Sequence, residues 1–407
     1  MSMENRWLLP EAVSEVLPPH ARAMDLLGRA VMDLFWSWGY DAIDPPLIEY
    51  LESLLTGTGQ HLDLETFKIT DQLSGRLMGV RADITPQAAR IDAQVLRGDG
   101  PRRLCYLGPV LHTRSDGRGG SRCPLQVGAE LFGDASPQSD LEVIALMLET
   151  LLRAGLDDLH LDLGHVGIYR ALMQEAALPG QDERQLFDLL QRKAMPELRA
   201  FLAGHPMSRQ VAGWLWALPD LNGPVDVLAR ARTVLAGAGA GVEAALAELT
   251  RLAERLDQRY SQVTLHLDLA ELRGYDYHTG VVFAAFQSGR GQDLARGGRY
   301  DHVGEVFGRA RPATGFSADL HALYHAGRSR AAPAAAIWAP VAGEDPALEA
   351  AVVALRHQGA AGHPRLERGK WLAERAALRS PPDLARRAVA CGCMDSLNKR
   401  RPGGLAE

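Results

Sequence analysis

The stretch from Leu265 to Phe286 constrains the fold of this chain most strongly, because it places two apolar strands around a short polar segment. Its first part alternates leucine with polar residues, as a half-buried strand does, and its last part is the apolar run Val281–Phe283. Residues 273–280 carry a guanidinium, two phenols, a carboxylate, an imidazole and a hydroxyl. Burying so many polar groups without partners would destabilise the fold, so we expect them to line a ligand pocket. The alternative is a hairpin whose tyrosines cover an edge of the core.

A second glycine-rich segment follows closely. Residues 296–301 read Arg-Gly-Gly-Arg-Tyr-Asp, and glycines of this kind let backbone approach a neighbouring group closely. The two segments together predict two neighbouring strands that line one small-molecule site.

The amino-terminal region predicts a helix, an extended segment and a hairpin. Apolar residues recur at helical spacing over Pro19–Tyr40, and the prolines in Ala42–Glu49 favour a strand edge or an interface. The hairpin joins Phe67–Thr70 to Arg76–Val80. A further helix begins near Thr85, which we expect to be its cap, with Pro86 at the first helical position.

The middle of the chain predicts two antiparallel strands, residues 104–108 and 125–132, joined by a polar, glycine-rich loop over residues 114–122. Gln126 and Glu130 lie four residues apart and therefore share one strand face. This face is either a pocket floor or a solvated surface. A helix over residues 140–152 and an alternating strand over residues 159–163 follow.

The domain organisation is a main domain, residues 1–330, and a small carboxy-terminal segment, residues 331–407. A helical subdomain rich in alanine and leucine interrupts the main domain at about residues 167–260. A strand and helix over residues 313–323 close the main domain, and residues 328–335 form a linker. The last segment resembles the start of an α/β module, with a strand at 336–340, a helix at 346–357 and no second apolar strand. We expect weak order over residues 361–407; a basic RNA-binding tail is the less favoured alternative.

Composition indicates an ordinary globular protein: 407 residues, 46% hydrophobic and 23% charged. The formal charge of −6 argues against a broad nucleic-acid-binding surface. No apolar run is long enough for a membrane helix and no signal sequence precedes the first helix, so we expect a cytoplasmic protein. We expect four free thiols and no metal site, because the spacing of the four cysteines does not match a zinc site (Cys105, Cys123, Cys391 and Cys393).

The motifs, taken in order, resemble the catalytic core of class II histidyl-tRNA synthetases over about residues 8–325. The ordered set comprises the strand around Pro46, residues 81–85, 107–114 and 126–130, and then residues 273–280, 296–301 and 314–320. The resemblance implies an α+β fold with an antiparallel sheet, flanking helices and an inserted helical subdomain. It also implies a homodimer formed through the core.

The same resemblance implies a histidine pocket. Asp83 stands where a synthetase usually has a glutamate that meets the substrate ammonium group, and Thr85 matches its hydroxyl neighbour. Glu130 is placed to accept from an imidazole N–H, and His278 replaces a tyrosine of the family. The implied histidine-binding residues are Asp83, Thr85, Gln126, Glu130, Arg273, Tyr277, His278 and Tyr300.

The positions that hold ATP in class II synthetases differ here. His112 stands in place of the second-motif arginine, Arg114 in place of a glutamate, and Ala322 in place of the third-motif arginine. Without these two guanidiniums the chain cannot make their bidentate bonds to a triphosphate, so we expect adenylation to fail. We therefore predict no catalytic residues.

A synthetase-like chain that keeps the amino-acid pocket but not the ATP-binding arginines resembles the regulatory subunits of ATP phosphoribosyltransferase. This resemblance implies a non-catalytic chain that assembles with a short catalytic subunit, typically as a hetero-octamer, at the first step of histidine biosynthesis. It implies L-histidine as an effector and no other cofactor. The alternatives are a divergent histidyl-tRNA synthetase and a synthetase-like module that binds RNA or protein; tRNA binding is the less favoured outcome.

Overall fold

A computed structural model describes residues 8–55, 60–115, 120–272, 274–275, 277–327, 337–339, 346–357 and 362–364. The chain divides into two compact units, residues 1–330 and 331–407. Several predicted features lie outside the described residues: Arg273, Asp276, Cys391, Cys393, residues 116–119 of the loop at 114–122, and the linker at 328–335.

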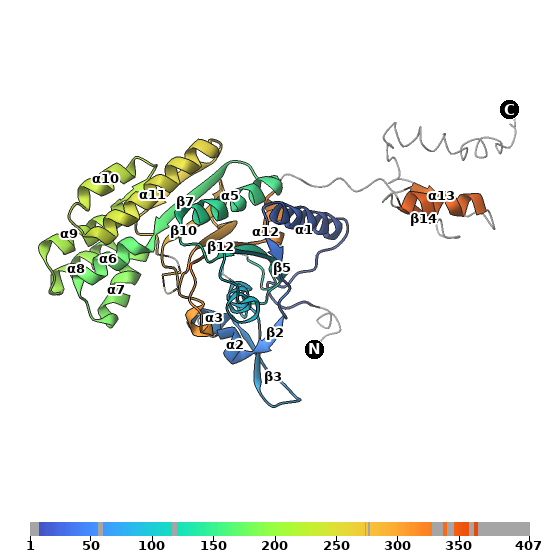
Figure 1. Cartoon of the computed structure of the whole chain (residues 1–407), viewed down its shortest axis with the longest axis horizontal. Helices are drawn as coiled ribbons and strands as arrows, with labels where there is room; N and C mark the ends of the chain where they lie inside the picture. Colours follow the sequence, from blue (N-terminus) through green and yellow to red (C-terminus); the bar gives the residue numbers. More distant parts are fainter. Residues whose placement is uncertain are drawn as a thin grey trace. The chain divides into compact units, whose positions relative to one another are not determined.

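The described part of the first unit is built on a nine-stranded mixed sheet, drawn in Figure 1. Most neighbouring strands are antiparallel, as predicted, but the pairs β1–β5 and β7–β9 are parallel. In spatial order the strands are β1 (Asp41–Ala42), β5 (Arg102–Pro109), β6 (Leu125–Phe132), β12 (Ala313–Asp319), β11 (Ala295–Arg299), β10 (Val281–Gln287), β7 (Leu159–His165), β9 (Thr264–Asp268) and β8 (Asn222–Gly223).

The two strands of the opening sequence stretch are not neighbours, so the hairpin alternative is wrong. Strand β7 lies between β9 and β10, parallel to the first and antiparallel to the second. The connection between β9 and β10 is much longer than the two to five residues of a tight hairpin loop, which leaves room for another strand. The expectation that the two polar, glycine-containing segments belong to neighbouring strands is confirmed. Strands β10 and β11 pair directly, with Val282 opposite Gly298.

Helices α1 (His20–Ser37), α5 (Pro137–Arg153) and α12 (Leu320–Ala326) pack on the sheet. Helix α5 buries almost every apolar side chain over Val143–Leu148, as expected for a helix between a sheet and other helices. Helix α1 buries one apolar face, where the rings of Phe35 and Phe316 meet edge to face at 5.8 Å. This contact joins the first helix to β12, an interior strand of the sheet.

A helical insertion separates β7 from β9, as predicted. Figure 1 shows its helices gathered at one end of the sheet. A core of leucines holds them together, including Leu172, Leu215 and Leu249. The helices are α6 (Val166–Ala176), α7 (Gly180–Gln191), α8 (Met195–Gly204), α9 (Arg209–Ala217), α10 (Val227–Val234) and α11 (Ala240–Arg259), with a 3-10 turn at Leu218–Asp220.

A separate three-stranded sheet has the order β2-β4-β3 and contains the predicted hairpin, with Thr70 opposite Leu77. The predicted cap at Thr85 is wrong. Helix α4 (Thr85–Arg90) includes Thr85, and the residue before it, Ile84, has no polar side-chain atom to form a cap; the Thr85 hydroxyl is bonded to Tyr106 instead. The remaining elements are β2 (Ile48–Tyr50), α2 (Leu51–Leu55), α3 (Gln60–Glu65), β3 (Phe67–Thr70), β4 (Leu77–Val80), a π-helix (Ile91–Leu96) and a 3-10 turn (Glu305–Phe307).

The described part of the second unit contains β13 (Ile337–Ala339), α13 (Pro346–His357) and β14 (Gly362–Pro364). The two strands pair in parallel, so a second strand follows the helix, although it is not an apolar one. Apolar periodicity could not reveal β14, because its sequence is Gly-His-Pro. Residues 365–407 lie outside the described residues. Among the helices that the structure describes, none has the length and apolar character needed to span a membrane.

Candidate functional site

Glu130 is the centre of a buried hydrogen-bond network. It lies on β6 and is 1% exposed. The hydroxyl of Tyr106, from β5, donates to its Oε1 at 2.9 Å, and the hydroxyl of Tyr300, at the end of β11, donates to its Oε2. Two tyrosines, one on β5 and one directly after β11, therefore meet the carboxylate that β6 carries.

Glycines on the neighbouring strands make room for this network. Gly315 lies opposite Glu130 on β12, and a Cβ atom there would overlap the Glu130 carboxylate. Gly128 lies opposite Tyr106, and a Cβ atom there would stand 2.5 Å from the Tyr106 hydroxyl. Two strand glycines, which weaken a sheet by themselves, thus admit large polar side chains into the interior.

Burial raises the pKa of Glu130 to about 8, because a carboxylate loses its hydration inside the sheet. The hydrogen bonds from Tyr300 and Tyr106 act in the opposite direction and favour the ionised form. The carboxyl group therefore changes charge near neutral pH. A cationic ligand, or one that donates a hydrogen bond, would favour its ionised form.

A second carboxylate, Asp83, lies beside this network and is partly exposed. Gln126 holds it in place: the amide Nε2 donates to Asp83 Oδ1 at 2.7 Å, while the Gln126 Oε1 accepts from the backbone N–H of Ile84 at 2.9 Å. The backbone N–H of Thr85 also donates to Asp83 Oδ1, at 3.0 Å. Gln126 thus acts on Asp83, and the pocket-floor alternative for Gln126 and Glu130 is favoured over a solvated surface.

The Thr85 hydroxyl joins the same network. Its Oγ1 is 3.1 Å from the hydroxyl of Tyr106. A phenol has one hydrogen, and Tyr106 gives it to Glu130, so Thr85 is the donor in this pair. Tyr106 was not predicted from the sequence. The signal that could have identified it is Gly128, since a glycine inside an apolar strand often marks the close approach of another group.

The segment after β9 contributes Tyr277 and His278. Tyr277 is 43% exposed and His278 is buried, and their rings are 4.3 Å apart at an angle of 41°. Gly274 has φ +68°, and a Cβ atom there would overlap the imidazole of His278; a Cβ atom at Gly298 would stand 2.9 Å from it. The imidazole therefore fits between two glycines. Arg273 lies outside the described residues, so its predicted role stays a prediction.

The three positions matched to ATP-binding residues hold side chains that do not form a cationic clamp. The imidazole Nε2 of His112 is 2.9 Å from the carbonyl oxygen of Ala82, and Arg114 is exposed to solvent. Ala322, on α12, borders a hollow of about 280 Å³ along Arg290–Leu294 and offers a methyl group. Together, these three positions do not supply the pair of guanidiniums that would bind one phosphate group.

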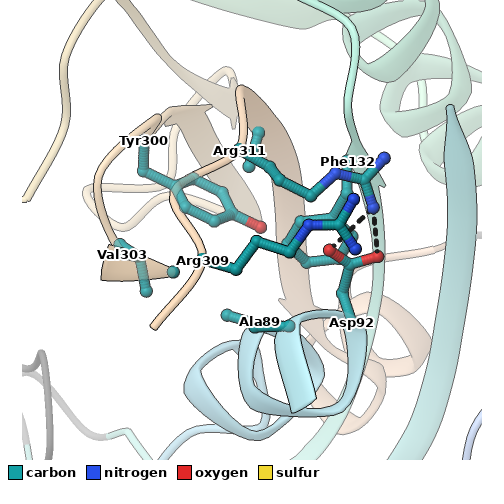
Figure 2. Close-up of a pocket in the computed structure, with 10 residues that line it drawn as sticks. Ala89, Asp92, Phe132, Tyr300, Val303, Arg309 and Arg311 are labelled. Atoms are coloured by element: carbon teal, nitrogen blue, oxygen red, sulfur yellow. Dashed lines mark hydrogen bonds and ion pairs between the residues drawn. The ribbon is translucent and has the colours of Figure 1, made fainter. Parts of the chain in front are cut away.

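A small cavity lies behind Tyr300, as Figure 2 shows. It is lined by Phe132, Arg309 and Asp92 among others, and its volume of about 10 Å³ is at the lower limit for one water molecule. Arg311 donates two hydrogen bonds to the buried Asp92 carboxylate, at 2.7 and 2.9 Å. This ion pair ties the segment after Tyr300 to the π-helix and supports the wall of the site. The cavity itself is too small for any ligand larger than one water molecule.

Among the residues that the structure describes, no group of three histidine, cysteine, aspartate or glutamate side chains is placed to hold a metal ion. The described cysteines, Cys105 and Cys123, carry free thiols. The side chains gathered here offer two carboxylates, four hydroxyls and an imidazole, which are groups that bind a ligand through hydrogen bonds and charge.

Comparison with known proteins agrees with this geometry. The histidyl-tRNA synthetase family matches residues 12–323. A protein from Thioalkalivibrio sulfidiphilus, named ATP phosphoribosyltransferase regulatory subunit, is 58% identical over 360 residues, which cover 88% of this chain and 91% of the relative. The chain belongs to the family of ATP phosphoribosyltransferase regulatory subunits.

Solved structures place the regulatory-subunit fold among the synthetases. A structure from Bacillus halodurans, titled ATP phosphoribosyltransferase regulatory subunit/histidyl-tRNA synthetase, superposes with a TM-score of 0.77 at 28% identity and covers 94% of this chain and 96% of its own. A chain of the ATP phosphoribosyl transferase (HisG:HisZ) complex from Thermotoga maritima has a TM-score of 0.57 at 17% identity and covers 75% of this chain and 98% of its own. The second likeness concerns the fold alone. The predicted class II synthetase-like fold is confirmed.

Proposed function

We propose that this chain is the non-catalytic regulatory subunit of an ATP phosphoribosyltransferase, required for activity and for histidine feedback at the first step of histidine biosynthesis. The observation that carries the proposal is a contrast between the Glu130 pocket and the positions matched to ATP-binding residues. The buried carboxylate of Glu130 accepts hydrogen bonds from two tyrosine hydroxyls, while His112 and Ala322 occupy the positions of ATP-binding arginines. The names of the close relatives agree with this assignment.

L-Histidine is the proposed effector. Glu130 would accept a hydrogen bond from the imidazole N–H of histidine, and Asp83 would pair with its α-ammonium group. Gln126 and Thr85 hold Asp83 and Tyr106 in place, while Tyr277, His278 and Tyr300 bound the remaining space. Two carboxylates suit a ligand that carries both a cation and an N–H donor.

The proposed partner is the short catalytic subunit of ATP phosphoribosyltransferase in the cytoplasm. This chain would form a homodimer through its core and join the catalytic subunit in a hetero-octamer. Histidine would then act by favouring one arrangement of the assembly. Coupling between two such sites is typically about 1–3 kcal/mol, which corresponds to roughly 5- to 150-fold in affinity.

The experiment is phosphoribosyl transfer from PRPP to ATP by the short catalytic subunit of the same organism, with and without this chain, over a histidine titration. The proposal predicts that this chain raises the rate and that histidine then lowers it. The catalytic subunit alone, titrated with histidine, is the control. An unchanged rate at every ratio, with no complex on size-exclusion chromatography, would contradict the proposal and favour tests of aminoacylation instead.

A further inference from the structure

The segment between β9 and β10 lies between two parts of the first unit. Its residues Tyr275 and Tyr277–Gly280 contact the helical insertion on one side and the strands of the candidate pocket on the other. We call the described residues of this segment, 274–275 and 277–280, the pocket loop. The contacts between this loop and the helical insertion determine where Tyr277 and His278 lie.

Arg170, on α6 of the helical insertion, holds the pocket loop at two points. Its Nη2 donates to the carbonyl oxygen of Tyr275 at 2.7 Å and to that of His278 at 2.9 Å. The guanidinium also lies over the ring of Tyr275, 4.5 Å from the ring centre. One side chain of the insertion therefore fixes both ends of the turn that carries Tyr277.

Tyr275 anchors the loop in the insertion through its ring. Its hydroxyl donates to Glu183 Oε1, on α7, at 2.8 Å. The ring packs edge to face against Tyr169 at 5.1 Å and at a tilt against Phe187 at 5.4 Å. A residue within the predicted pocket motif thus belongs physically to the helical insertion.

The other end of the loop is bound to the pocket strand. The backbone N–H of Thr279 donates to the carbonyl oxygen of Arg299 at 2.7 Å, and the Thr279 hydroxyl accepts from the N–H of Asp301 at 3.1 Å. These bonds lie on both sides of Tyr300, which donates to Glu130. A continuous set of short contacts therefore runs from α6 and α7 through the loop to the central carboxylate.

We propose that Arg170 is a positioning residue that couples the helical insertion to the candidate pocket. It holds the pocket loop in the conformation that presents Tyr277 and His278, and a ligand that orders the loop also orders α6 and α7. Naming L-histidine as that ligand rests on the proposed function. The coupling itself rests on the contacts of Arg170 and Tyr275.

The test uses the full chain and the substitution Arg170→Met, which keeps the apolar stem and removes the donors. Arg199→Met is the matched control, because Arg199 lies on the same insertion with its guanidinium over the ring of Trp216, 4.8 Å from the ring centre. Arg170→Lys is the conservative variant. Hydrogen exchange of residues 277–287 and of α6–α7, and calorimetric histidine affinity, are measured for each.

We expect R170M to speed exchange in residues 277–283 and to weaken histidine binding about tenfold, equivalent to about 1.4 kcal/mol. R199M should leave both quantities unchanged, and R170K should fall between R170M and the wild type. In the wild type, saturating histidine should also slow exchange in α6 and α7, and this protection should be absent in R170M. A purely structural role for Arg170 would not produce that reciprocal effect.

Unchanged loop exchange, or unchanged histidine affinity, in R170M would overturn the coupling. If R170M does not fold, Tyr275→Phe is tested in its place, because this change removes the hydrogen bond to Glu183 and keeps the ring contacts. The coupling then requires that Tyr275→Phe alters hydrogen exchange in the pocket loop. If the wild type binds no histidine, the proposed function fails. Loop exchange alone then decides whether Arg170 couples the two parts.

Discussion

The pocket around Glu130 and the positions matched to ATP-binding residues lie in one fold but are built differently. In the pocket, a buried carboxylate has hydroxyl partners from two other strands, and the facing strands carry glycines that admit them. At the ATP positions, His112 bonds to a backbone carbonyl and Arg114 extends into solvent. Buried polar groups are costly to leave unpaired, and both oxygens of the buried Glu130 carboxylate have a hydroxyl partner, whereas the side chains at the ATP positions share no such network.

The largest expected effect tests the pocket side of this comparison. Glu130→Ala removes the acceptor for two tyrosine hydroxyls and for the proposed ligand. We expect histidine affinity to fall about 100-fold, or about 2.7 kcal/mol, as measured by calorimetry on the complex with the catalytic subunit. Unchanged binding and inhibition in this variant would refute the pocket assignment.

Gly315→Ala tests whether the strand glycine is required. Its Cβ atom would overlap the Glu130 carboxylate and stand 2.9 Å from the carbonyl oxygen of Ala129. We expect a loss of about 2 kcal/mol in the free energy of unfolding, since overpacking costs typically 1–3 kcal/mol, measured by urea denaturation. Gly213→Ala is the control: it lies in α9 with open space around it and should stabilise the chain slightly. Equal stability of the two variants would contradict the account.

A triple variant tests the positions matched to ATP-binding residues. It introduces the synthetase side chains at all three positions, as His112→Arg, Arg114→Glu and Ala322→Arg. Each guanidinium can add charge-assisted bonds to phosphate, worth about 1.5–3 kcal/mol apiece when well placed. We expect ATP affinity to rise at least tenfold over that of the wild type, measured by equilibrium dialysis. Histidine-dependent ATP–pyrophosphate exchange by the wild-type chain would show that the present side chains already support adenylation.

The last prediction concerns the pH dependence of stability. Because the folded pKa of Glu130 is about 8, well above its ordinary value of 4.5, the folded chain holds a proton that the unfolded chain has released between these pH values. This group therefore reduces stability as pH rises from about 4.5 to 8, by at most about 1.4 kcal/mol per unit. Thermal unfolding of Glu130→Gln should decline less over this range than that of the wild type. Parallel curves would mean that Glu130 titrates normally.

Much of the fold could be predicted from the sequence, because helices and strands leave local periodic patterns. The helix at 140–152, the strand at 159–163 and the pairing of β5 with β6 all follow from patterns a few residues long. The insertion of β7 between β9 and β10 could not be predicted, because no local pattern encodes which strand lies beside which. Strand β14 could not be predicted for a different reason: its three residues, Gly-His-Pro, carry no apolar pattern.

By itself, the sequence determined which chemistry is available: a glutamate and glutamine on one strand face, polar loops beside apolar strands, and histidine and alanine at two positions matched to arginines. The tertiary structure alone decided which groups meet. Tyr106 and Tyr300 bond to one carboxylate although Tyr300 is 170 residues from Glu130 in the chain, and Arg170 holds a loop 105 residues away. Side-chain type is local information, whereas contacts between distant residues arise when strands and helices pack together.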